Sequence, residues 1–412
     1  MSQGPMAESD RNSSLLRLFG PAVIASFTAS ILGFVFWVVA ARLYSPAQVG
    51  VTGSTISMVS GIGTAAAGGL YAVLLRVLPV HENPRRLLWV ASAATMGFGA
   101  VMGLVVGLCH LSRLSVPLLW LLIPAAASVW SFFSLQDSIL LSLRKTRVLF
   151  ISNVGFGMAK LLLLVAFGGY ALGIAGAWLF PLLFVVPAVA LVADRALAGA
   201  SPIEAATMKV TPRHVLAEYW NSFVVVFSIA GVPIVATLVV GGAFAGLVYV
   251  CWTVYTASDM TSTWLSNAMV VTATERGFDV QRAVRHGRSI IPLMLAGSVV
   301  AMALSPLILA IFGSRYAPAL PLMRLLFVAF AIRVLVGVAL AGRRIQQRYW
   351  RVAGGQTVYS VGVVGGAVLA ARAHSITLIG IAVILAAVIE LIAIASRPML
   401  AGLVGSTATN DA

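Results

Sequence analysis

Residues 376–396 of the chain read ITLIGIAVILAAVIELIAIAS, with Glu390 as their single charged residue. A helix needs about 20 predominantly apolar residues to cross the hydrocarbon core of a bilayer. The stretch has this length, and its residues do not alternate between apolar and polar as the strands of a membrane barrel do. Since a chain in lipid must satisfy its own backbone hydrogen bonds, the stretch predicts a transmembrane helix.

Similar runs recur along the whole chain of 412 residues, of which 60% are hydrophobic and 9% are charged. Soluble domains carry about 25% charged residues, so this chain has too little polar surface to cover a water-facing globule. The pattern predicts an all-α polytopic membrane protein of about 12 transmembrane helices with no soluble domain of any size. We expect the spans at residues 19–41, 50–75, 87–110, 117–141, 148–170, 174–194, 219–240, 246–271, 290–312, 320–341, 354–371 and 376–396.

The positive charges are distributed unevenly between the two sides of the membrane. Of the 27 Lys and Arg residues, most fall on the side of the N-terminus, while the loops of the other side hold only Arg42, Arg113, Arg315 and Arg372. Cytoplasmic loops carry an excess of Lys and Arg, so both termini are predicted to be cytoplasmic and the protein to lie in the cell (inner) membrane. The net charge of +15 is therefore a topology signal. We expect no nucleic-acid partner, because no basic stripe is interleaved with aromatic residues.

The longest hydrophilic stretch, residues 195–217, falls at the midpoint of the chain. It predicts an N-terminal six-helix lobe at residues 1–197, a cytoplasmic linker at 198–217 and a C-terminal six-helix lobe at 218–412. With an even number of spans in each half, the halves would be parallel repeats about an axis along the membrane normal. Residues 144–147 (RKTR) open the fifth span and residues 344–348 (RIQQR) precede the eleventh, which favours a repeat. Coincidence between low-complexity helices is the alternative.

The sequence lacks the motifs of several enzyme classes. It has neither a G-x-x-x-x-G-K-[ST] phosphate loop nor a G-x-S-x-G elbow, and none of its five histidines forms a metal pair at helical spacing. Cys109 and Cys251 lie inside apolar runs without a recognisable motif, so we infer neither a disulfide nor a metal site. We therefore predict a transporter and not an enzyme, with no catalytic residue, no metal and no cofactor.

Three ionisable residues fall near the centre of predicted spans, namely Lys160, Asp259 and Arg333. A charge at the bilayer centre costs at least about 2.5–3.5 kcal/mol on insertion scales, so such groups usually face a cavity or a partner. One interpretation is a substrate-binding central cavity, in which Lys160 and Arg333 attract an anionic head group and Asp259 balances or relays charge. The alternative is a structural ion pair, for instance between Asp259 and Arg333, that only ties helices together.

Other charged residues lie nearer the ends of the spans. Arg42, Arg76 and Arg324 are secondary candidates for the mouth of the cavity. Glu390 lies within about two turns of a cytoplasmic end, where snorkelling or an interfacial pair suffices to explain it. The second span is rich in glycine, which is typical of close helix packing, with a bending gate helix as the alternative.

Several segments together resemble a transporter family. Residues 41–50 (ARLYSPAQVG) resemble the first-loop signature of polysaccharide-biosynthesis flippases. Residues 311–326 (IFGSRYAPALPLMRLL) are similar to the segment that joins their ninth and tenth spans, and residues 173–177 (GIAGA) to the start of their sixth. The resemblance covers about residues 15 to 400. It implies the O-antigen-flippase-like branch of the multidrug/oligosaccharidyl-lipid/polysaccharide exporter superfamily.

This resemblance implies a V-shaped pair of six-helix lobes that opens alternately to the two sides of the membrane. The implied activity is the flipping of a lipid-linked oligosaccharide or polysaccharide precursor, with its sugar-pyrophosphate head in a cationic cavity and its tail in the bilayer. The implied partners are this lipid-linked glycan, membrane lipids, and a glycan polymerase or glycosyltransferase of polysaccharide or lipopolysaccharide biosynthesis. Coupling to an ion gradient is implied without identifying the ion. Alternatives are a drug or small-cation exporter of the same architecture, with Asp259 as coupling carboxylate, and a non-transporting scaffold or enzyme of a glycan pathway.

Overall fold

The computed structural model of the protein describes residues 27–78, 81–109, 118–170, 172–198, 212–275 and 280–395. All regular elements within these ranges are helices. In chain order, they are a helix at Phe27–Leu43, α2 (Pro46–Val77), α3 (Pro84–Cys109), α4 (Leu118–Ser142), α5 (Thr146–Ala166), α6 (Gly173–Leu179), α7 (Leu182–Ala198), α8 (Pro212–Val239), α9 (Gly242–Glu275), α10 (Val280–Ala303), α11 (Ser305–Phe312), the 3₁₀-helix η2 (Ser314–Ala319), α12 (Leu320–Ile345), α13 (Tyr349–Arg372) and α14 (Ile376–Ile394).

The described residues contain 8 helical stretches long and apolar enough to cross a membrane, or up to 9 if a bent pair counts as one span. The prediction of an all-helical polytopic protein is confirmed. The predicted span 174–194 corresponds to one apolar stretch, Gly173–Ala198, in which a short interruption at Pro181 separates α6 from α7, because proline lacks the N–H that a continuous helix would use. The predicted span 290–312 is divided at Leu304 into α10 and α11, which meet at a bend of 61°. The two chain termini, which are predicted to be cytoplasmic, lie outside the described residues.

The chain divides into two compact units, and each unit is made of two separate stretches of the sequence. Unit 1 comprises the described parts of residues 1–43 and 59–215, and unit 2 those of 44–58 and 216–412. The later boundary falls within the predicted linker 198–217. The earlier one falls inside α2, so that the first part of this helix is grouped with unit 2 and its remainder with unit 1. The predicted lobes 1–197 and 218–412 remain a prediction.

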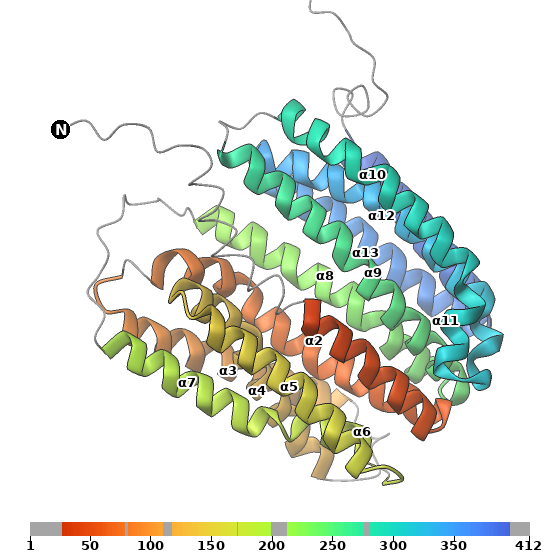
Figure 1. Cartoon of the computed structure of the whole chain (residues 1–412), viewed down its shortest axis with the longest axis horizontal. Helices are drawn as coiled ribbons and strands as arrows, with labels where there is room; N and C mark the ends of the chain where they lie inside the picture. Colours follow the sequence, from red (N-terminus) through yellow and green to blue (C-terminus); the bar gives the residue numbers. More distant parts are fainter. Residues whose placement is uncertain are drawn as a thin grey trace, which may run out of the picture. The chain divides into compact units, whose positions relative to one another are not determined.

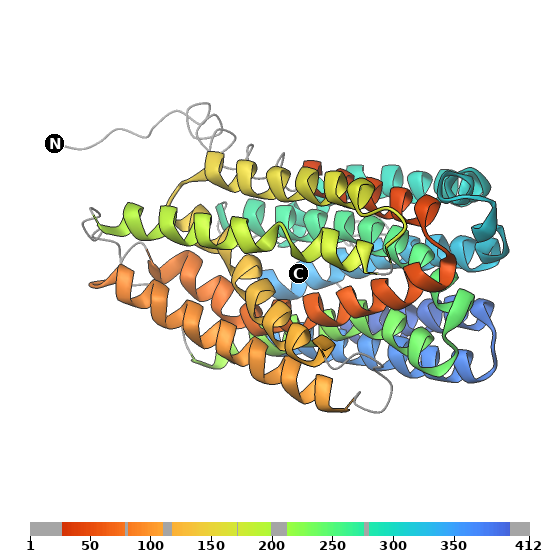
Figure 2. The same ribbon diagram turned by 90° about the horizontal axis from the view of Figure 1, so that it is seen from below.

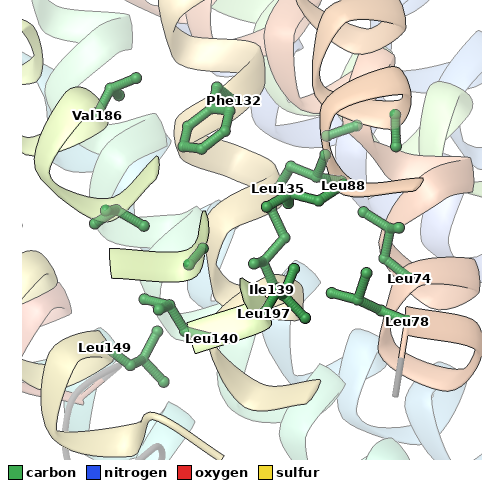
Figure 3. Close-up of a cluster of buried hydrophobic side chains, with 14 residues drawn as sticks. Leu74, Leu78, Leu88, Phe132, Leu135, Ile139, Leu140, Leu149, Val186 and Leu197 are labelled. Carbon is green, nitrogen blue, oxygen red and sulfur yellow. The ribbon is translucent and has the colours of Figure 1, made fainter. Parts of the chain in front are cut away.

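The core of unit 1 is apolar and is formed mainly where α3, α4 and α7 pack together (Figure 3). Leu135 and Ile139 of α4 are fully buried there against Leu88 of α3 and Leu197 of α7. Outside this core, many large apolar side chains remain exposed, among them Ile151 and Leu162 of α5, each 68% exposed. A helix whose apolar side chains also cover its outer face is typical of a membrane span.

Unit 2 is built around α12, which packs against α9, α10 and α14. Figure 1 shows α9, α10 and α12 side by side, and the blue pair in Figure 2 is α13 with α14.

Pro233 interrupts the hydrogen bonding of α8, because proline cannot donate to the carbonyl four residues earlier. The indole N–H of Trp252 on α9 donates to that carbonyl, of Ile229, at 2.7 Å. The proline is therefore tolerated because the neighbouring helix satisfies the freed group.

A turn of the same backbone conformation occurs once between α4 and α5 of unit 1 and again between α12 and α13 of unit 2. Between α4 and α5, Arg144 has φ 56° and Lys145 has φ −89° and ψ 51°; between α12 and α13, Gln347 has φ 57° and Arg348 has φ −90° and ψ 54°. Both turns close with the same bonds, Lys145 N–H to Leu140 at 2.8 Å and Arg348 N–H to Arg343 at 2.9 Å. This is the Schellman arrangement, in which a left-handed residue ends a helix. The segments RKTR and RIQQR thus fold into the same backbone turn, which also occurs between α13 and α14, where His374 has φ 51° and the Ser375 N–H donates to Ala370 at 3.0 Å.

Candidate functional site

A buried group of charges in unit 2 joins three helices. The guanidinium of Arg333, on α12, donates from Nε and Nη2 to the two carboxylate oxygens of Asp259, on α9, each at 3.3 Å. Its Nη1 donates to Oε2 of Glu390, on α14. The ion pair between Asp259 and Arg333, one of the two sequence interpretations, is therefore present, and Glu390 is a third member. We call Asp259, Arg333 and Glu390 the charge cluster.

Two tyrosines border the charge cluster. The guanidinium carbon of Arg333 lies 4.4 Å from the centre of the Tyr359 ring on α13, a distance at which a cation is attracted to the ring face. The hydroxyl of Tyr359 is 2.7 Å from that of Tyr255 on α9. Both rings are buried. The tyrosines therefore connect α9 and α13 to the same buried position.

The members of the charge cluster differ in exposure. The side chain of Glu390 is 0% exposed and that of Arg333 is 8% exposed, whereas that of Asp259 is 20% exposed. Oε2 of Glu390 accepts from Arg333, but Oε1 is buried and has no hydrogen-bond partner among the described residues. Asp259 is thus the open end of the cluster and Glu390 its closed end.

Lys160 is held in a different environment, in unit 1. Its ammonium nitrogen on α5 lies 5.3 Å from the centre of the Phe36 ring and 5.1 Å from that of Phe156. Lys160 is only 9% exposed, and no carboxylate of the described residues pairs with it. A cation between aromatic faces is attracted by their quadrupoles, but its charge is not neutralised.

The aromatic surroundings of Lys160 extend further into unit 1. Phe156 lies 4.8 Å from Phe133 and 6.1 Å from Trp130, measured between ring centres. Trp130 in turn stacks on Trp178 at 4.4 Å, and its indole N–H donates to Thr64 on α2. Lys160 therefore lies at the edge of a group of aromatic side chains from α4, α5 and α6.

The structure brings Asp259 and Arg333 together and places Lys160 in the other unit. The cavity predicted to hold all three remains a prediction. Among the secondary candidates, Arg42 and Arg324 have exposed side chains near the ends of their helices, and the side chain of Arg76 lies outside the described residues. Within the described residues, no group of three or more His, Cys, Asp or Glu side chains could hold a metal ion.

Sequence reasoning gave Glu390 too little weight. It lies in the last third of its span, where its distance from the centre favours an interfacial role, but α14 buries it against α12. The signal that could have found it is its isolation as the only charge in residues 376–396. The aromatic partners of Lys160 could not be found in the same way, because Phe36 comes from a helix far away in the sequence.

Comparison with known proteins gives a match in fold alone. No protein-family model matches the sequence, and no curated protein matches it either. The solved structures that match include a multidrug resistance MATE family transporter of the MOP superfamily in an inward-facing conformation, with TM-score 0.60 and 14% identity over 92% of this chain and 96% of that one. They also include the lipid II flippase MurJ in an inward closed conformation, with TM-score 0.63 and 13% identity over 93% and 89% of the two chains.

An outward-facing MATE family transporter matches as well, with TM-score 0.62 and 14% identity over 95% of this chain and 93% of that one. These neighbours have two-lobe, twelve-helix folds, and the present chain shares that fold. Together with the apolar helices, this fold indicates a multi-pass membrane protein. At 13–14% identity, the similarity concerns the fold.

Proposed function

We propose that the protein is a flippase that moves a lipid-linked oligosaccharide or polysaccharide precursor across the cell membrane by alternating access. A sugar-diphosphate head group cannot cross hydrocarbon unaided, because leaving water costs its charges and hydroxyls too much free energy. A protein that carries such a head group needs a positive charge that its own carboxylates do not already neutralise.

The observation that carries this proposal is the environment of Lys160. Its ammonium group is buried between Phe36 and Phe156, and no acidic partner is present among the described residues. Arg333, by contrast, is already bonded to two carboxylates. Lys160 is therefore the better candidate for a phosphate of the substrate, and Arg333 serves its own cluster. A flippase for lipid II has the same fold, which is compatible with a lipid-linked substrate.

The direct test is a leaflet-resolved transport assay in liposomes. The purified protein is reconstituted with a fluorescent, diphosphate-linked lipid oligosaccharide, and its arrival in the opposite leaflet is measured by an impermeant quencher or enzyme. We expect transport by the unmodified protein and a decrease of at least about tenfold in Lys160→Met. Such a decrease corresponds to about 1.4 kcal/mol in the transport step. Lys160→Arg, which keeps the charge, should retain part of the activity.

The matched control is Lys145→Met. Lys145 is the exposed residue that precedes the same helix, α5, so its loss removes one positive charge without changing the buried position. Full transport by Lys160→Met, with Lys145→Met equally active, would remove the assigned role of Lys160. Absence of transport of any diphosphate-linked lipid by the unmodified protein would count against the flippase proposal itself.

A second candidate function is export of drugs or small cations, as in the multidrug transporters that share the fold. The observation that favours it is the acidic excess of the charge cluster, where Asp259 and Glu390 face one arginine. A permeant cationic dye distinguishes the two functions in the same liposomes. Dye efflux that depends on Asp259, without movement of the lipid-linked glycan, would favour cation export.

A further inference from the structure

We propose that the charge cluster of unit 2 binds one exchangeable proton, that Glu390 is the residue that carries it, and that the proton reaches Glu390 from the side of Asp259. This inference concerns a site in unit 2 and does not depend on which substrate the protein moves. It follows from charge, from an unpartnered oxygen and from the difference in exposure along the cluster.

The charges of the cluster do not balance. Asp259 and Glu390 would contribute two negative charges when ionised, and Arg333 contributes one positive charge that is not given up in proteins. One negative charge would then be in excess within a buried region. An isolated ionised carboxylate in apolar surroundings is so costly that it normally gains a cation or is neutralised.

The elements packed around Glu390 supply one positive group among the described residues, Arg333. The groups that face Glu390 are Arg333 of α12, Asp259 of α9 and Tyr359 of α13, and Tyr255 of α9 follows behind Tyr359. Alongside Glu390, α13 presents the backbone of Gly355, where an added Cβ would lie 3.8 Å from Cγ of Glu390. None of these groups except Arg333 carries a positive charge. The excess charge must therefore be neutralised by something that comes from outside the cluster.

One carboxylate oxygen without a hydrogen-bond partner, Oε1 of Glu390, indicates where the excess charge is neutralised. Oε1 of Glu390 is buried and accepts no hydrogen bond from the described residues, although Oε2 is bonded to Arg333. Both oxygens of Asp259 accept from Arg333. A proton on Oε1 leaves every bond of Arg333 intact and removes the excess charge.

A proton fits this position better than a metal ion does. Cations such as Ca²⁺ and Mg²⁺ take six or more oxygen ligands, several of them from carboxylates or carbonyls. Within the described residues, no three His, Cys, Asp or Glu side chains lie close enough together to hold a metal ion. A proton needs one oxygen only. In the binding step, Oε1 of Glu390 forms an O–H bond with a proton released by hydronium, which leaves water behind.

The exposures define a direction of entry. The side chain of Asp259 is 20% exposed, that of Arg333 is 8% exposed and that of Glu390 is 0% exposed. A proton from water therefore meets Asp259 first, and Arg333 stands between the two carboxylates. α12 packs directly against both α9 and α14, and Arg333 adds an ionic contact to each of these pairs. Loading Glu390 therefore weakens the ionic part of the attraction between α14 and α12.

The test is pH-dependent infrared difference spectroscopy of the full-length protein in lipid nanodiscs. A protonated carboxylic acid has a carbonyl stretch that shifts when H₂O is replaced by D₂O, and this band identifies the loaded state. We expect a titrating band in the unmodified protein between about pH 5 and about pH 9, where ordinary exposed carboxylates are already ionised. The band should be absent in Glu390→Gln. Proton uptake over the same range should fall by about one proton per chain in this variant.

Two further variants complete the set. Glu218→Gln, on α8 of the same unit, is the matched control and should keep the band. Asp259→Asn removes the excess negative charge, so its band should form only at more acidic pH. If Glu390→Gln does not fold, Glu390→Asp serves instead. It keeps a carboxyl group but moves it by one methylene, so the frequency of the band should change.

Three results would overturn the proposal. Persistence of the band in Glu390→Gln would place the proton on another residue. Absence of any titrating band in the unmodified protein would mean that both carboxylates stay ionised and that the cluster is a purely structural ion triad. Loss of the band on addition of sodium chloride, but not of choline chloride, would mean that sodium fills the site in place of a proton.

Discussion

Lys160 and Arg333 are both cations buried within membrane-spanning helices, but the two units accommodate them differently. Lys160 is surrounded by the rings of Phe36 and Phe156, and Arg333 is bonded to Asp259 and Glu390. A lysine on a flexible stem remains able to pair with a charge that arrives later, whereas a bidentate arginine fixed by carboxylates does not. The comparison separates a buried cation that has aromatic neighbours and no carboxylate partner among the described residues from one that is bonded to two carboxylates.

The matching turns at Lys145 and Arg348 allow the sequences of unit 1 and unit 2 to be aligned around Lys160 and Arg333. Trp130 lies fifteen residues before Lys145, and Arg333 lies fifteen residues before Arg348. Phe156 and Tyr359 each lie eleven residues after the same two positions. Unit 1 therefore packs Trp130 near Phe156 where unit 2 stacks Arg333 on Tyr359. Equivalent positions of the repeat carry aromatic side chains in one unit and a charge in the other.

The largest effect is expected from Arg333→Gln, which removes the only positive charge of the charge cluster. Breaking a buried ion pair by removal of one partner typically costs about 3–5 kcal/mol, because the remaining charge is left uncompensated. Thermal unfolding and folded yield in detergent measure the loss. The triple variant Arg333→Gln, Asp259→Asn, Glu390→Gln should recover much of the stability. A stable single variant would show that the carboxylates do not need Arg333.

The next effect comes from transferring the charge to the equivalent position of unit 1. Trp130→Arg places a guanidinium beside Phe156 but supplies no carboxylate, and it also removes the stacking on Trp178. We expect a loss of about 3 kcal/mol or more, comparable with other large substitutions in a core. Trp130→Phe, which keeps an aromatic ring, is the control. Equal stability of Trp130→Arg and Trp130→Phe would show that unit 1 tolerates charge at this position as unit 2 does.

The smallest effect is expected from Tyr359→Phe. The ring remains under Arg333, and only the hydrogen bond to Tyr255 is lost. Removal of one partner of a buried hydrogen bond costs about 1–3 kcal/mol, and removal of both is closer to neutral. The double variant Tyr255→Phe, Tyr359→Phe should therefore unfold at a higher temperature than the single one. The opposite order would mean that Tyr255 bonds to the charge cluster once Tyr359 is absent.

The fold could be predicted from the sequence because a membrane span has a simple signature. An apolar run such as residues 376–396 indicates at once that the segment is a helix, that it is long enough to cross the membrane and that it lies in lipid. The interruption at Pro181 and the bend at Leu304, which Pro306 follows, could not be predicted, because proline is often tolerated within spans, as Pro233 is in α8. Whether a given proline divides a helix depends on its neighbours, which the local sequence does not contain.

The candidate site could be predicted only in part. Lys160, Asp259 and Arg333 could be found because a charge within an apolar run is conspicuous. Their partners could not be assigned, because the pairing depends on which helices pack together. Glu390 is also a single charge within an apolar run. Its distance from the centre of the span favours an interfacial position, so the sequence did not single it out. Depth along a helix was thus a weaker guide than burial between helices.

The division of α2 between the units limits how the chain can be cut. The backbone of Gly50 lies against Ala245 and Gly246, so closely that a Cβ added at Gly50 would come within 2.7 Å of the Ala245 carbonyl carbon. All three residues belong to unit 2, although Gly50 lies far before the midpoint of the chain. A fragment that ends near residue 215 would carry away a segment that unit 2 needs. Separately expressed halves should therefore be unable to fold as independent bodies and should recombine only by exchanging this half-helix.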